Sequence, residues 1–318
     1  MIGYILKRIL MAILVVIVTS ALTFCLLSAS PRDTAEIIIK KILIGEEEYN
    51  PTSGEIQTVK DVFGLNDPAI ILYFKWLWNA VHGDFGRSYV SGLPVLTEIL
   101  IRLPATAILA FFSTILSIII AIPLGVLSAA RQNSPLDHAC LAYSAFFIAI
   151  PNFWFALILI LIFSLYLGIL PVAGFGSPSH LVLPSITLAT GMSAVTARLT
   201  RSSLLEVLGQ NYITTAKSKG LKETTILYRH ALRNALIPVI TIVGIQMGHL
   251  LSGTVIVETV FGWPGIGKLL ADSIEVRDIP MIQGCVVFIA AMFSLVNLLV
   301  DLSYRLLDPR VKYGGEHA

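Results

Sequence analysis

The sequence has 318 residues, of which 56% are hydrophobic and only 13% are charged. Because soluble globular domains are much less apolar, this composition predicts a membrane protein. The formal net charge of +2 does not indicate nucleic-acid binding, and the three cysteines lie inside apolar runs without metal-ligand spacing, so neither a zinc site nor a disulfide framework is expected.

The first apolar run follows Lys7 and Arg8 and extends from Ile9 to about Ala29. It is longer than the hydrophobic core of a signal peptide, which has roughly 7–15 residues. We therefore expect residues 1–30 to hold an amino-terminal tail and an uncleaved first membrane span, with the amino terminus in the cytoplasm.

The region 31–102 is the longest polar stretch, and turn-forming residues such as Pro51, Gly54 and Pro68 interrupt it. The part from Ile70 to Trp78 is rich in aromatic residues, which prefer the membrane interface. We expect 31–102 to be an extracytoplasmic region and 103–318 to be a core with five further spans.

Within this core, the second span is expected from Leu103 to Ala130, with a kink at Pro123. The next apolar run, residues 139–170, is too long for one straight crossing, because about 20 helical residues already cover the hydrocarbon layer. A bend at Pro151 is therefore expected. The last three spans are expected at residues 181–197, 236–257 and 281–302.

A basic, polar segment, residues 210–238, separates the fourth and fifth spans. Lys217 and Lys219 lie near the end of a predicted helix, where the helix dipole favours positive charge. Gly220 then occupies the position of a left-handed terminating residue, and Leu221 follows where such a stop often adds an apolar contact. A second helix is expected to begin near Glu223, so the segment is predicted to form a helix, a glycine corner and a helix.

The charges of the loops test this arrangement. Most lysines and arginines of the chain fall in the segments proposed to lie inside, including the basic segment 210–238 and the tail after residue 302. Six crossings with both termini in the cytoplasm satisfy the tendency of basic loops to stay inside.

The residue order in the basic segment resembles the cytoplasmic loop of permeases of binding-protein-dependent ABC importers. The signature of that family is Glu-Ala-Ala, three residues and Gly, with a distal Leu-Pro or Leu-x-Pro. Thr214, Thr215 and Ala216 match its first part, with threonine in place of the family's glutamate, and Gly220 and Pro238 match the rest. The run from Arg229 to Pro238 is similar to the dipeptide, oligopeptide and nickel branch of the family.

This resemblance implies an all-α polytopic membrane protein with the type I ABC importer permease fold and six transmembrane helices. It further implies a multi-pass protein of the plasma (inner) membrane of a prokaryote. The expected partners are a second homologous permease in a heterodimer, two ATPase subunits and an extracytoplasmic solute-binding protein. The chain itself is expected to bind no cofactor, with ATP and Mg²⁺ held by the ATPases.

By the same resemblance, residues 204–235 are expected to form the cytoplasmic loop that couples the permease to its ATPases; we call these residues the coupling loop. The residues expected to serve ATPase coupling are Thr214, Thr215, Ala216, Lys217, Gly220, Leu221 and, beyond the loop, Pro238.

The fifth span carries polar residues that are candidates for lining a pore, namely Gln246, Met247, His249 and Ser252. Gln246 and His249 are three residues apart and therefore share a helix face. Met247 and His249 are candidates only for transient metal contacts, which thioether and imidazole groups can make. No resident metal site is expected, because a conduit must release what it binds.

Several functions remain open at this point. Nickel, chelated, is the cargo we expect from similarities such as residues 151–154, and di- or oligopeptides are the alternative, favoured by residues 244–246. An ion-coupled carrier is a different class of function, which the scarcity of ionisable residues deep in the spans disfavours.

Catalysis by the chain itself has no support in the sequence. The run from Gly262 to Lys268 fits the start of a phosphate-binding loop, but Leu269 replaces the Ser or Thr that would hold Mg²⁺. No other catalytic motif is present, so the chain is not expected to be an enzyme.

Overall fold

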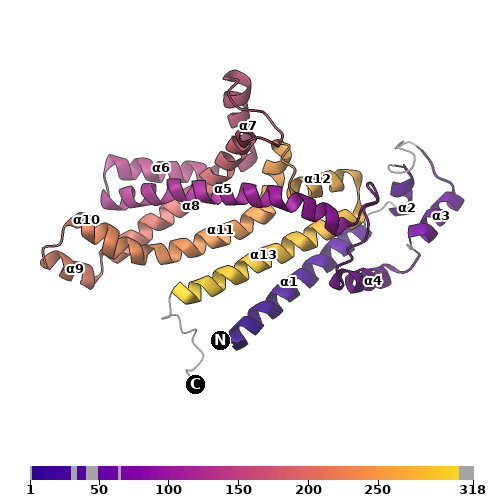
Figure 1. The fold of residues 1–318 in the computed structure, drawn as a ribbon, viewed down its shortest axis with the longest axis horizontal. Helices are drawn as coiled ribbons and strands as arrows, with labels where there is room; N and C mark the ends of the chain where they lie inside the picture. The colour runs from indigo at the N-terminus through magenta and orange to yellow at the C-terminus, as the bar shows by residue number, and fades with distance from the viewer. Residues whose placement is uncertain (1, 30–33, 41–48, 64–65, 308–318) are drawn as a thin grey trace. The chain divides into compact units, whose positions relative to one another are not determined.

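The computed structural model describes residues 2–29, 34–40, 49–63 and 66–307, and these are almost entirely helical (Figure 1). Within those ranges the only extended pairing is an isolated bridge between Arg87 and Pro94. Five described helices are long and apolar enough to cross a membrane, or six if one strongly bent pair counts as a single span. The predicted all-α membrane architecture is therefore confirmed.

The chain forms two compact units. The first comprises residues 1–106 and 264–294, and the second comprises residues 107–263 and 295–318. Helices α5 (Val95–Ala130) and α13 (Ile279–Leu307) each contribute residues to both units.

The first unit contains the predicted first span, α1 (Ile2–Ser28), whose side chains are mostly exposed, as expected of a helix that faces lipid. Its helices are tied by polar contacts near Ser20. The Ser20 hydroxyl lies 2.8 Å from the Tyr73 hydroxyl, and the Gln283 amide donates to the Ser20 carbonyl oxygen at 2.9 Å. The shorter helices of this unit are α2 (Thr34–Ile37), α3 (Ser53–Phe63), α4 (Ala69–Val81) and α12 (Ile266–Val276).

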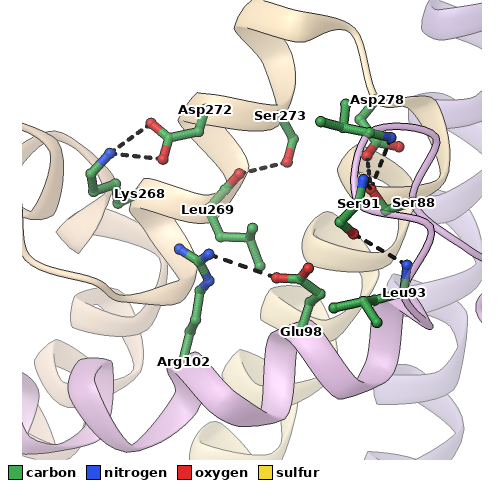
Figure 2. A network of polar contacts seen from close by, with 11 residues as sticks. Ser88, Ser91, Leu93, Glu98, Arg102, Lys268, Leu269, Asp272, Ser273 and Asp278 are labelled. Atoms are coloured by element: carbon green, nitrogen blue, oxygen red, sulfur yellow. Dashed lines mark hydrogen bonds and ion pairs between the residues drawn. The ribbon is translucent and has the colours of Figure 1, made fainter. Parts of the chain in front are cut away.

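Asp278 organises the loop that precedes α5 in the first unit, as Figure 2 shows. Its buried carboxylate accepts hydrogen bonds from the Ser88 hydroxyl and from the N–H of Tyr89, the latter at 3.1 Å. It also accepts a long bond, 3.4 Å, from the N–H of Met281, the usual role of a residue that caps the start of a helix. Burial, together with the nearby Asp278 charge, raises the pKa of Tyr89 to about 12, so this hydroxyl stays protonated at neutral pH.

The second unit is built around α8 (Pro178–Leu208), which is buried along most of its length. It packs against α6 (Pro135–Ala149), α7 (Asn152–Leu159) and α11 (Leu232–Val260). Several of its hydroxyl groups bond to carbonyl groups of the same helix, as Thr187 does to the Leu183 carbonyl and Thr200 to that of Thr196, both at 2.8 Å. The small and hydroxylated residues of this span therefore serve close helix packing.

The bend predicted in the third span is present. Helix α6 ends at Ala149, and α7 starts after Pro151 at an angle of 103° to it. Helix α7 continues into a π-helical segment, Ile160–Tyr166. Proline at position 151 has no N–H for a helical bond and disfavours helical backbone at the residue before it, so the break falls there.

Several helix boundaries differ from the sequence prediction, and two of the differences have a clear physical reason. Helix α5 begins at Val95 rather than Leu103, because the apolar run marks only the lipid-soluble part of a helix whose first turns carry Glu98 and Arg102 as a 3.6 Å ion pair. Helix α11 begins at Leu232 rather than at the expected residue 236, and it runs through Pro238. Neighbouring helices make proline tolerable in such a position.

The close approach of α5 and α8 depends on Gly125. A Cβ atom there would lie 2.7 Å from the Ala197 carbonyl oxygen, which is part of the backbone and cannot rotate away. We expect Gly125→Val to destabilise the protein by about 2–3 kcal/mol, as overpacking does. Thermal unfolding in detergent would measure this, with Gly209→Ala as the control, since a Cβ at Gly209 meets no atom closer than 3.5 Å. Equal stability of the two variants would contradict the prediction.

Candidate functional site

The coupling loop contains helix α9 (Asn211–Ser218), which ends as the sequence predicts. Gly220 has a φ of +75°, the left-handed conformation. The Gly220 N–H donates to the Lys217 carbonyl at 2.9 Å, and the Leu221 N–H to that of Ala216 at 3.4 Å. This pair of bonds is the Schellman motif, which fixes the direction in which the chain leaves the helix.

One face of α9 is anchored in the protein. Ile213 and Ala216 are buried in an apolar cluster with residues of α5, of α8 and of the chain that leads into α11. The other buried members of this cluster are Val126, Ala129, Leu204, Val207, Ile226, Ala231 and Ala235. Because α9 shares its core with the ends of three long helices, a displacement of α9 must move those ends or break the cluster.

The opposite face of α9 is exposed. Thr214, Thr215 and Lys217 all point into solvent, and Leu221 is 40% exposed beyond the glycine corner. Ala216 differs from these predicted coupling residues, since its burial suits it to hold the helix rather than to contact a partner. Pro238 is exposed but belongs to α11 and not to the loop.

The second half of the coupling loop is irregular. Helix α10 (Glu223–Thr225) passes into a π-helical segment, Ile226–Ala231, before α11 begins. A hydrogen bond of 2.8 Å from the Asn234 amide to the Tyr212 hydroxyl closes the loop onto the start of α9. The two halves are therefore joined by both the apolar cluster and a polar contact.

Next to the coupling loop lies a largely buried ion pair that the sequence does not predict. The Arg201 guanidinium of α8 donates two bonds, of 2.7 and 2.8 Å, to the Asp137 carboxylate of α6. The same carboxylate accepts from the Ser128 hydroxyl of α5 and from the Asn133 N–H at 2.9 Å. Asp137 is only 1% exposed and Arg201 is partly buried, so this charge pair joins α5, α6 and α8 near the end of the bundle that bears α9.

The predicted pore residues do not all line the same surface. Gln246 and His249 both line a pocket between α8 and α11, as expected from their shared face. Met247 is 37% exposed and is not among the lining residues, while the side chain of Ser252 lies outside the described residues. Among the described residues no group of three or more His, Cys, Asp or Glu side chains is placed to hold a metal ion.

The run from Gly262 to Lys268, which resembles the start of a phosphate-binding loop, makes its polar contacts within the protein. The N–H of Ile266, at the start of α12, donates to the Thr106 hydroxyl at 2.9 Å. Lys268 donates to both carboxylate oxygens of Asp272, at 2.8 and 2.7 Å, as Figure 2 shows. The groups that would hold a phosphate thus have partners already.

Comparison with protein families matches residues 121–313 to the binding-protein-dependent transport system inner membrane component, and residues 1–110 to the N-terminal part of such a membrane component. The chain belongs to this family. It is therefore a multi-pass permease of the inner membrane of a prokaryote and a subunit of an ABC importer, as the resemblance of the coupling loop implied.

The permease is similar over almost its whole length to transport permeases from other bacteria. It is 42% identical to the oligopeptide transport system permease protein AppB of Bacillus subtilis (strain 168), covering 98% of this chain and 100% of that protein. It is 38% identical to the glutathione transport system permease protein GsiC of Escherichia coli (strain K12), with the same coverage.

Solved structures support the fold. The methionine ABC transporter MetNI in an inward-facing form matches with a TM-score of 0.56 at 19% identity, covering 66% of this chain and 96% of that chain. An amino acid ABC transporter matches with a TM-score of 0.52 at 18% identity, covering 68% and 94%. At this identity the likeness concerns the fold alone.

Proposed function

We propose that this permease, paired with a second homologous permease, forms the membrane passage for ATP-driven import of di- or oligopeptides. The cargo is supported by the relatives, whose names state oligopeptide and glutathione transport. These names favour di- or oligopeptides over chelated nickel as the cargo. His249 and Met247 were the only candidate contacts for nickel. Those two side chains also differ in position, since only His249 lines the pocket.

The exposed face of α9 is the proposed docking site for ATPase subunits, which would carry ATP and Mg²⁺. This proposal rests on the observation that α9 has one buried face and one exposed face. Ile213 and Ala216 fix one side in the core of the bundle, and Lys217 with its polar neighbours remains available on the other. A helix built in this way can transmit a push from a partner to α5, α8 and α11.

The ion-coupled carrier is the second class of function. Proton or sodium carriers use ionisable groups inside the membrane. The described spans do contain the buried pair Asp137–Arg201, but its bidentate geometry and two further hydrogen bonds leave the carboxylate little capacity to exchange a proton during transport. This observation favours a structural role for the pair and external power for the permease.

The test is uptake into proteoliposomes that contain both permeases, with or without the ATPases and the solute-binding protein. We expect uptake of a radiolabelled tripeptide only when ATP and all subunits are present, and no competition by Ni²⁺. Uptake of nickel instead of peptide would overturn the cargo. Uptake driven by an ion gradient without ATPases would overturn the mechanism.

A further inference from the structure

A pocket of about 250 Å³ opens between α7, α8 and α11 in the second unit. Its lining comes from three elements: Asn152 of α7, then Leu188, Gly191 and Met192 of α8, then Gln246, His249 and Leu250 of α11. This volume is below the range of roughly 300–1,000 Å³ typical of sites that enclose a whole drug-sized ligand. The pocket therefore suits one part of a cargo molecule rather than an entire peptide.

The lining is apolar on one side and carries the polar side chains of Asn152, Gln246 and His249 on the other. Leu188, Met192 and Leu250 supply the apolar wall. Asn152 and Gln246 supply side-chain amides, and no Asp, Glu, Lys or Arg is among the lining residues. Such a lining suits an uncharged side chain, because a charged group placed there would lose its hydration without gaining an opposite charge.

The amide of Gln246 is held in position. Its oxygen accepts from the Thr196 hydroxyl at 3.0 Å, and its nitrogen donates a long bond of 3.4 Å to the Met192 carbonyl. An amide nitrogen has two donors, so a second N–H remains to serve a carbonyl of the cargo.

Gly191 keeps space open beside the other amide of the pocket. A Cβ atom added at Gly191 would lie 3.3 Å from the Asn152 Oδ1 atom, so any larger residue would crowd this amide and reduce the cavity. A small residue at this point is what a receptive pocket between α7 and α8 requires.

We infer that this pocket is a subsite for one uncharged, chiefly apolar side chain of a peptide in transit, with the amides of Asn152 and Gln246 facing its backbone. The inference rests on the proposed function and deepens it. It predicts that the permease itself, and not only the solute-binding protein, discriminates among peptides by the bulk of a side chain. The absence of Asp, Glu, Lys and Arg from the lining keeps the interaction weak, as passage requires.

The experiment compares trileucine with triglycine in the complete reconstituted complex. Both peptides are supplied at saturating concentration, so that differences in affinity of the solute-binding protein do not enter. We expect Gly191→Val to lower the maximal uptake rate of trileucine at least about tenfold relative to that of triglycine, since the change of a single methylene group in an apolar pocket is already worth about that factor. Gly191→Ala, which adds a single methyl group, should give a smaller change in the same direction and serves if the valine variant fails to assemble.

Ile240→Ala is the matched control, because Ile240 lies on α11 but is 47% exposed and does not line the pocket. It should leave the ratio of the two uptake rates unchanged. An equal fall for both peptides in the Gly191 variants, or no change in either, would overturn the inference alone. Failure of the unmodified complex to import either peptide would overturn the proposed function and this inference with it.

Discussion

Replacement of Gly220 with valine should reduce ATP-driven uptake by more than about tenfold while leaving the membrane-spanning part folded. The φ of +75° at this position costs an ordinary L-residue about 1–2 kcal/mol, and a β-branched residue is the least suited to it. A Cβ at Gly220 meets no atom within 4 Å, so backbone strain, and not crowding within the permease, is the cause. The strain would undo the hydrogen bonds that end α9 and alter the direction of the exposed face.

Gly220→Asn is the matched variant, since asparagine tolerates the left-handed conformation better than other residues with side chains. It should retain most of the uptake and the ATPase binding. Co-purification of the ATPase subunits and peptide uptake in proteoliposomes would measure both effects. A valine variant that binds ATPases and transports as well as the asparagine variant would show that the corner is not required.

Removal of the Asp137 carboxylate should have the second large effect. Asp137→Ala leaves the Arg201 guanidinium without its bidentate partner and removes the acceptor of the Ser128 hydroxyl and the Asn133 N–H. Breaking one side of a buried charge pair is more damaging than removing both. We expect the melting temperature in detergent to fall by roughly 5 °C or more for either single alanine variant.

The double variant Asp137→Ala with Arg201→Ala provides the control. Because it leaves no unpaired charge, its melting temperature should lie no lower than that of Asp137→Ala alone. A loss equal to the sum of the two single losses would show that the two residues stabilise the protein independently, contrary to their geometry.

Local signals in the sequence predicted the local features of this fold. The glycine corner at Gly220 and the bend after Ala149 were both predicted, because each depends on the backbone preference of a glycine or a proline close to a helix end. The start of α5 at Val95 was missed, since hydrophobicity marks the hydrocarbon layer and not the end of the helix.

Contacts between distant residues could not be predicted in the same way. Asp137 and Arg201 are 64 positions apart, and in the sequence their charges served only to orient the loops. The pocket likewise depends on how α7, α8 and α11 pack. The shared face of Gln246 and His249 pointed to it, but the helix period alone could not separate lining residues from the exposed neighbour Met247.

In the proposed function, α9 lies in the cytoplasm and contacts an ATPase subunit. The most direct test is a cross-linking measurement with cysteine at position 217, in a permease whose native Cys25, Cys140 and Cys285 are replaced by serine. We predict that a short bifunctional reagent joins Lys217→Cys to the ATPase, that Ile274→Cys on α12 gives no such product, and that a membrane-impermeant maleimide added to intact cells does not label position 217. Labelling of position 217 from outside the cell, or absence of its cross-link in an actively transporting complex, would show that α9 is not the docking site.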